Sequence, residues 1–203
     1  MARRVRAVAA PAVALLVALA VAGCDAADRI APPPPSNVEV DTPQLRQVKA
    51  EAGIEPCVPG SATDGGLPDV TLACLGGGES VDLATLQGPL VLNFWQAGCE
   101  PCRAEMPALQ QFHERYGDQV PIIGVDSNDV FPGAALELAR DTGVTYPLLA
   151  DPGGELQGTK LRVPGLPTFF FLSADGELTS ASGGLDSVDE VVAMVESHLG
   201  ITL

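Results

Sequence analysis

The sequence predicts one α/β domain built on a mixed β-sheet, and three observations lead to that prediction. Between residues 90 and 150, short apolar runs of strand length alternate with longer segments of helical periodicity. A β-hairpin pattern and an amphipathic helix follow and close the chain, an element order typical of a mixed sheet. The stretch 53–203 also has the length of one domain.

The N-terminal residues have the composition of an export signal. Three arginines within the first six residues precede an apolar run over 8–22, and small residues lead to Cys24. This pattern is similar to a bacterial lipoprotein signal, which implies that residues 1–23 are cleaved off and that Cys24 carries a lipid. The alternative is a retained transmembrane anchor, but the apolar run is shorter than the roughly 20 residues that span a bilayer. In both cases the domain lies outside the cytoplasm, and the lipid would hold it at the extracytoplasmic face of the cytoplasmic membrane.

Residues 24–52 are predicted to be a tether between the lipid and the domain. Four consecutive prolines at 32–35, followed by polar residues, favour an extended and solvated chain. A short helix over residues 43–52 is compatible with the sequence.

The first half of the domain is expected to contain an N-terminal β extension and the centre of the sheet. Strands over 70–75 and 80–83 flank the glycine turn at 76–78. The run 90–95 is apolar at nearly every position, as expected of a strand buried on both faces. Apolar residues at helical spacing predict a helix over 99–116.

The second half continues the alternation and then changes to a hairpin around Asp175 and Gly176. The turn after 148–150 is marked by aspartate, proline and two glycines. The expected elements are strand 121–125, helix 133–142, strand 148–150, a helical turn within 156–161, strands 168–172 and 178–182, and helix 187–199.

Cys99 and Cys102 stand where the apolar strand gives way to the predicted helix. A cysteine at a helix N-terminus meets unpaired N–H groups and the positive end of the helix dipole, so the Cys99 thiolate should be stabilised. Cys102 lies three residues on, on the same side and within disulfide reach, while Pro101 fits an early helical position because it needs no N–H partner. The spacing indicates a redox pair in which Cys99 attacks and Cys102 resolves.

Other uses of the pair fit the sequence less well. A four-cysteine zinc site needs a second close pair, whereas Cys57 and Cys74 are seventeen residues apart. A purely structural bridge usually closes a longer loop. We therefore expect neither a metal nor a cofactor.

The run from Asn93 to Pro107, with its Asn-Phe-Trp start and its Cys-Glu-Pro-Cys centre, is similar to the active-site segment of the thioredoxin superfamily. It most resembles the membrane-anchored TlpA/ResA-like thiol-disulfide oxidoreductases, and the resemblance covers about residue 67 to the C-terminus. It implies a thioredoxin fold, exported protein substrates such as oxidised apocytochrome c, and electrons from a membrane thiol carrier. One departure is Gly98, where that family usually has tryptophan, and it bears on partner docking.

The same resemblance implies roles for residues around the pair. Its Leu-Pro-Thr segment implies that Pro167 is cis and packs against the cysteines, and that the Leu166 backbone pairs with an incoming chain like an added strand. A functional glutamate stands at the position of Glu105, which implies proton handling. The alternative for Glu105 is an exposed first-turn carboxylate that complements the helix dipole. Asn93 replaces the buried aspartate of thioredoxin itself, which leaves Glu105 as the candidate general base.

Trp95, the only tryptophan, is a candidate for shielding the site and contacting substrate, with a core position as the alternative. Cys57 and Cys74 are expected to form a structural disulfide, because the exported compartment permits one and the loop between them is rich in glycine and proline. Such a bridge contributes about 3 kcal/mol in the chain-entropy model. The alternatives are two free buried thiols or a second redox pair, for which the sequence shows no activating feature such as a helix start.

The charge balance excludes some partners. The chain has 11 Lys and Arg against 26 Asp and Glu, a formal net charge of −15. Nucleic acid and anionic lipid surfaces are poor partners for such a protein. The acidic surface fits simple solubility.

Three other activities remain as alternatives to a reductant. The same cysteines could form disulfides in exported proteins, and the direction depends on the reduction potential. They could also hold copper as soft ligands in a chaperone, although no histidine lies near Pro167. A peroxidase is disfavoured because the Thr-x-x-Cys arrangement of peroxiredoxins is missing before Cys99.

Overall fold

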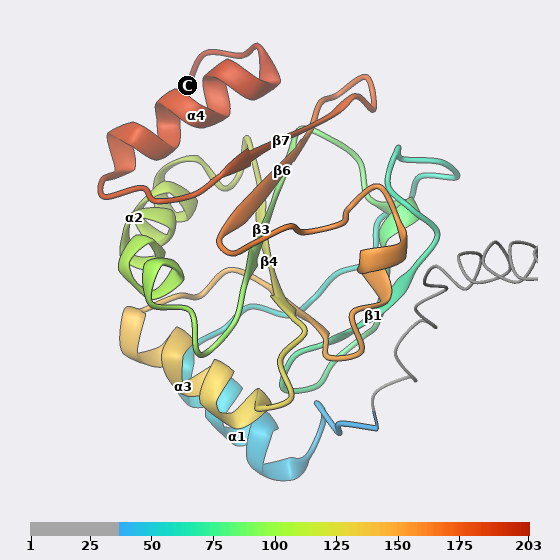
Figure 1. Ribbon diagram of the computed structural model, residues 1–203, viewed down its shortest axis with the longest axis vertical. Coiled ribbons are helices and arrows are strands. Elements are labelled where there is room, and N and C mark those ends of the chain that lie inside the picture. The colour runs from blue at the N-terminus through green and yellow to red at the C-terminus, as the bar shows by residue number, and fades with distance from the viewer. Residues whose placement is uncertain (1–36) are drawn as a thin grey trace, which may run out of the picture. The chain divides into compact units, whose positions relative to one another are not determined.

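A seven-stranded sheet with the order β2-β1-β5-β4-β3-β6-β7 runs through the folded unit (Figure 1). The computed structural model describes residues 37–203, so the predicted signal peptide of residues 1–23 and the lipidation site Cys24 lie outside the described residues. Within 37–203, none of the helices combines the length and the apolar character needed to cross a membrane.

The elements closely follow the predicted ones. The strands are β1 (Thr71–Cys74), β2 (Val81–Asp82), β3 (Leu90–Trp95), β4 (Ile122–Ser127), β5 (Leu148–Asp151), β6 (Thr168–Leu172) and β7 (Leu178–Ser182). The helices are α1 (Pro43–Ala52), α2 (Glu100–Tyr116), α3 (Pro132–Thr142) and α4 (Val188–Leu199), with short 3-10 turns η1 (Leu83–Thr85) and η2 (Glu155–Gly158). The mixed α/β fold with an N-terminal β extension is confirmed.

Strand direction brings several loops to one edge of the sheet. β3 pairs with β4, and β4 with β5, in parallel, while β6, β7, β1 and β2 join antiparallel. The register sets Trp95 beside Asp126 and Ser127 beside Asp151, so the carboxyl ends of the parallel strands meet. The segment carrying Cys99 leaves the sheet at this edge.

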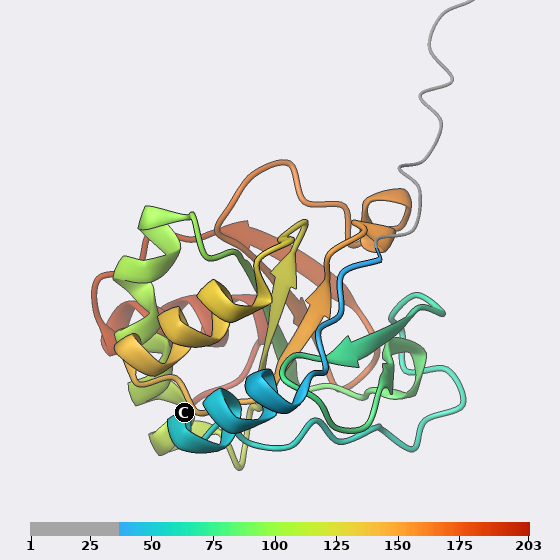
Figure 2. The ribbon, with the colours of Figure 1, turned by 90° about the horizontal axis from the view of Figure 1, so that it is seen from below.

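The two faces of the sheet are covered differently. Val91 and Trp95 of β3 point into a core shared with α1, α2, α3 and α4, whereas Leu92 and Phe94 point into a second core on the opposite face. Figures 1 and 2 show the helices gathered on one side of the sheet, with η1, η2 and the connecting loops on the other. Because both faces are covered, β3 is buried at every position.

The folded unit begins earlier than the sequence suggested. The Thr42 hydroxyl accepts a hydrogen bond from the N–H of Leu45 at 3.2 Å and caps α1, and Gly53 ends the helix in the left-handed region. Leu45 and Val40 are buried in the helix-side core, and α1 lies along α3 (Figure 2). Residues 38–52, assigned to the tether, therefore belong to the folded unit. The sequence did not predict this earlier start because α1 has few apolar positions and a mostly polar exposed face.

Replacing Leu45 by alanine tests this correction. Because Leu45 is 9% exposed and packs in the helix-side core, the change should lower the free energy of unfolding by about 2–4 kcal/mol. Urea unfolding measures the change, with the exposed Gln47→Ala in the same helix as the control. Equal effects of the two substitutions would mean that residues 38–52 belong to the tether and not to the folded unit.

A disulfide joins Cys57 and Cys74, as the sequence predicts, with their Cα atoms 5.8 Å apart. The two cysteines are 4% and 2% exposed. The bridge fastens the segment that follows α1 to β1 at a place where glycine and proline supply little core.

Candidate active site

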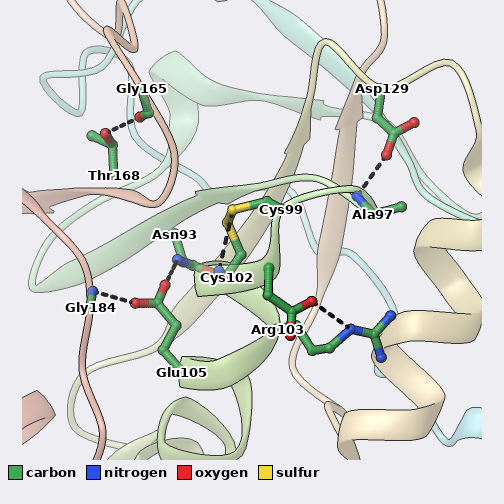
Figure 3. Close-up of a disulfide and its surroundings, with 11 residues drawn as sticks. Asn93, Ala97, Cys99, Cys102, Arg103, Glu105, Asp129, Gly165, Thr168 and Gly184 are labelled. Carbon is green, nitrogen blue, oxygen red and sulfur yellow. Dashed lines mark hydrogen bonds and ion pairs between the residues drawn. A yellow bond between two sulfur atoms is a disulfide. The ribbon is translucent and has the colours of Figure 1, made fainter.

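The turn between β3 and α2 places two cysteines at a helix N-terminus (Figure 3). Cys99 is the N-cap of α2, and its Sγ accepts a hydrogen bond from the N–H of Cys102 at 3.2 Å. The two sulfur atoms are joined in a disulfide. Cys99 is half-buried, whereas Cys102 has no exposed surface. A molecule approaching from solvent therefore meets Cys99 before Cys102, and the order of attack stays a prediction.

Two exposed charged side chains of opposite sign lie close to Cys99 in sequence. Exposed Glu100 follows it directly, and Arg103, which lies 3.9 Å from the Glu100 carboxylate, is turned to that partner. Within residues 37–203 no lysine, arginine or histidine side chain donates a hydrogen bond to Cys99 Sγ. The helix N-terminus is thus the main stabiliser of a thiolate at this position.

The loop before β6 supplies a neighbouring surface. The Leu166–Pro167 peptide is cis, as the resemblance implies. The Thr168 hydroxyl donates to the carbonyl of Gly165 at 2.6 Å, and the N–H of Gly183 donates to the carbonyl of Pro167 at 3.1 Å. These bonds fix the loop beside an open hollow of about 370 Å³, lined by residues 164–168, 182 and 183. Half-buried Leu166 lies in this hollow and also packs against the helix-side core, as Cys99 does.

Glu105 is a buried carboxylate, only 1% exposed. Its oxygens accept hydrogen bonds from the Asn93 amide at 3.3 Å and from the N–H of Gly184 at 2.9 Å (Figure 3). Burial raises the pKa of Glu105, and the hydrogen bonds from Gly184, Leu185 and Asn93 act in the opposite direction. The alternative of an exposed first-turn carboxylate is therefore wrong, because this side of α2 faces the sheet.

Gly183 is a glycine because the space around Glu105 is filled. A Cβ at position 183 would come closer than 3.0 Å to the Glu105 carboxylate, to Pro167 and to Phe169. Glu105 and the cis-proline loop thus meet across Gly183. This contact connects the helix that carries the cysteines to the loop beside them.

Trp95 occupies a core position, which the sequence analysis named as the alternative to a role at the site. Its side chain has no exposed surface and packs in the helix-side core. A Cβ at Gly124 would lie 2.9 Å from Trp95 Nε1 and 3.2 Å from the Tyr146 ring, so the glycine makes room for both aromatic side chains. Both faces of β3 are covered, and Trp95 shares the face of Val91, so its side chain lies beneath the helices.

Asp129, which the sequence analysis did not single out, holds the turn before Cys99, and a second aspartate lies beside it. Asp129 accepts hydrogen bonds from the N–H groups of Ala97 and Phe131, both at 2.8 Å (Figure 3). Asp126, 1% exposed, lies beside it, and burial together with the neighbouring Asp129 raises the pKa of Asp126 well above its usual range. A proton on Asp126 permits a hydrogen bond between the two carboxyl groups. The sequence feature that could have identified them is a pair of acidic residues at the end of an apolar strand.

The sequence matches the AhpC/TSA family over residues 65–181. Thiol-disulfide oxidoreductase ResA of Bacillus thuringiensis subsp. konkukian is 29% identical over 116 residues, which cover 56% of this chain and 66% of the relative. The ResA protein of Halalkalibacterium halodurans is 32% identical over 125 residues, 59% of this chain and 69% of the relative.

Among solved structures, a secreted disulfide oxidoreductase of Mycobacterium tuberculosis, homologous to DsbE of E. coli, is 30% identical. The match has a TM-score of 0.55 and covers 64% of this chain and 96% of the neighbour. With the curated relatives, the chain matches 58% to 69% of their length. The thioredoxin-like fold of this chain agrees with these neighbours.

The buried carboxyl of Glu105 gives a testable pH dependence. Its raised pKa means that the folded state favours the protonated form. The resulting contribution to the free energy of unfolding is complete below about pH 4.5 and is lost as the pH rises through the raised pKa. Relative to the non-titrating Glu105→Gln variant, the unsubstituted protein should therefore lose stability as the pH rises from about 4.5 to the raised pKa of Glu105.

Urea unfolding from about pH 4 to about pH 8 measures this difference. The exposed Glu177→Gln is the matched control and should show no such trend. A constant difference between the protein and Glu105→Gln across the range would contradict a raised pKa at Glu105.

Proposed function

The chain belongs to the AhpC/TSA family, and we propose that it is an exported thiol-disulfide oxidoreductase that reduces disulfides in other exported proteins. The observation that carries the proposal is the contrast between half-buried Cys99, at a helix N-terminus, and fully buried Cys102. Such an arrangement lets one sulfur meet a substrate while the other is kept for the second step. Position 96 holds glutamine, so the Thr-x-x-Cys arrangement of a peroxidase is missing from this segment.

The reaction begins with the reduced pair. The Cys99 thiolate attacks one sulfur of a substrate disulfide, and the other substrate sulfur leaves as a thiolate and takes up a proton. Cys102 then loses its proton and attacks the Cys99 sulfur of the mixed disulfide. The second substrate thiol departs, and two electrons have passed from the pair to the substrate. A membrane thiol carrier returns them.

Glu105 is the candidate acceptor for the Cys102 proton. It lies three residues after Cys102 on α2, so the two side chains share one side of the helix. Burial raises the pKa of Glu105, which makes its carboxylate a stronger proton acceptor than an exposed glutamate. Asn93 and Gly184 orient the carboxylate for this task.

The Leu166–Pro167 loop is the proposed substrate-binding surface. The hollow beside it is open, and the backbone of Leu166 can pair with an extended segment of the substrate. Main-chain pairing makes few demands on side chains, so the site would accept several exported proteins. Apocytochrome c is one candidate, on the strength of the resemblance to the TlpA/ResA-like proteins.

The electrostatics around Cys99 support the reducing direction. A thiolate held by a cation makes a pair more oxidising, because it stabilises the reduced form. Here Glu100 and buried Glu105 lie near the pair, and no cationic side chain within residues 37–203 donates to Cys99. The pair should therefore release its electrons readily.

An extracytoplasmic location completes the proposal. The predicted signal of residues 1–23 and the lipid at Cys24 would hold the domain at the outer face of the cytoplasmic membrane. The Mycobacterium tuberculosis neighbour is described as secreted, which supports export. The presence of a second disulfide, Cys57–Cys74, also fits an oxidising compartment.

Single cysteine variants test the mechanism with insulin as a model disulfide. Cys99→Ser should reduce insulin no faster than the uncatalysed background, because the attacking sulfur is gone. Cys102→Ser should lose turnover and accumulate a mixed disulfide with insulin at Cys99, which non-reducing electrophoresis and peptide mass spectrometry detect. Near-ultraviolet circular dichroism checks that both variants fold. Full turnover by either variant would contradict the roles assigned to Cys99 and Cys102.

A further inference from the structure

A buried lysine lies against the second disulfide. Lys49 of α1 is 9% exposed, and its Nζ donates to Cys74 Sγ and to the Gly77 carbonyl, each at 2.9 Å. Within residues 37–203 no carboxylate forms an ion pair with it, and Asp41, the nearest acidic influence, is bonded to Arg46. A disulfide sulfur is a weak acceptor. The ammonium of Lys49 thus lacks the counter-charge that burial normally requires.

That counter-charge appears when the disulfide opens. Reduction would leave a thiolate at Cys74, 2.9 Å from the ammonium, where a charge-assisted hydrogen bond forms in place of a weak one. Cys57 Sγ lies 3.2 Å from the carbonyl oxygen of Leu148, which can accept a hydrogen bond from a Cys57 thiol. The fold therefore holds a partner for each product of reduction: a cation for Cys74 and an acceptor for Cys57.

A cavity gives access to Cys57, one of the two cysteines of this bridge. It has a volume of about 740 Å³, and its lining includes Cys57, exposed Val58 and residues from the C-terminal end of α2, but not Cys74. Its other walls include Leu90 and Ile122, the first residues of β3 and β4, so it opens at the end of the parallel strands opposite to Cys99. The volume lies within the range of small-molecule sites.

We propose that Cys57–Cys74 is a second exchangeable disulfide, opened by a low-molecular-weight thiol that enters this cavity and attacks Cys57. The thiolate forms a bond to Cys57 Sγ, and the Cys57–Cys74 bond breaks, so that Cys74 leaves as a thiolate beside the Lys49 ammonium. A second molecule of thiol attacks the sulfur that the first one brought in, releases the oxidised thiol and returns Cys57 as a thiol. Two electrons pass from the small thiols to the bridge.

Lys49 sets the equilibrium of this exchange through its charge. It stabilises the reduced form, which contains the thiolate, more than the oxidised form, which does not. The couple is therefore easier to reduce than a buried bridge without the lysine. A purely structural Lys49, which only anchors α1 to Gly77, would affect folding stability and leave this equilibrium unchanged.

The test uses the full chain with Cys99→Ala and Cys102→Ala, so that failure here is separate from failure at the first pair. The protein is equilibrated at neutral pH in glutathione buffers, quenched with acid and alkylated. Peptide mass spectrometry then reports the state of Cys57 and Cys74. Lys49→Met removes the charge at similar length, Lys49→Arg keeps it, and Lys160→Met removes the other lysine of the chain as the matched control.

Lys49→Met should shift the equilibrium at least tenfold toward the disulfide, a lowering of the midpoint potential by about 30 mV or more. Lys49→Arg should keep most of the original potential and Lys160→Met all of it. An unchanged equilibrium in Lys49→Met, or an equal shift in Lys160→Met, overturns the proposal.

A brief exposure to glutathione tests the direction of attack. The trapped intermediate should carry glutathione on Cys57 and the alkyl group on Cys74. The opposite labelling contradicts attack from the cavity. Reduction that begins only at urea concentrations that unfold the chain shows that the bridge is purely structural.

Discussion

The hydrogen bond from the N–H of Cys102 to Cys99 Sγ depends on where β3 stops and α2 begins. β3 is buried on both faces and ends at Trp95, and the chain needs only a short turn to bring Cys99 to the N-cap position. Asp129 holds that turn through Ala97, and Glu105 joins the first turns of α2 to the segment after β7. These hydrogen bonds determine the positions of the accessible sulfur, the protected sulfur and the neighbouring proline loop.

The two disulfides sit in opposite electrostatic surroundings. Carboxylates from Glu100 and Glu105 lie near the first pair, whereas the Lys49 ammonium touches the second. Negative charge disfavours a thiolate and positive charge favours one. On our two proposals, the charges favour electron donation by the first pair and electron acceptance by the second. They lie toward opposite ends of the parallel strands, so one small fold keeps two couples separate.

Local patterns foretold much of this structure. β3 and β6 match the predicted ranges because their apolar runs end at strong turn signals, and β7 matches as the second strand of the hairpin around Asp175 and Gly176. The two cysteine bridges follow from spacing and compartment. Side-chain partners from distant elements were harder to predict. Trp95 was assigned to the site because it is close to the cysteines in sequence, whereas its side chain packs in the helix-side core. Lys49 escaped notice because its sulfur partner is 25 residues away, and only the packing of α1 on the fold brings the two together.

The midpoint potential of the Cys99–Cys102 couple tests the central claim most directly. The protein would be equilibrated in thiol redox buffers, and alkylation of Cys99 would report the reduced fraction. A reductant with carboxylates near its cysteines should have a potential near or below about −200 mV, in the range from glutaredoxins to thioredoxin. A value close to about −120 mV, as in a strong oxidant, would contradict the account.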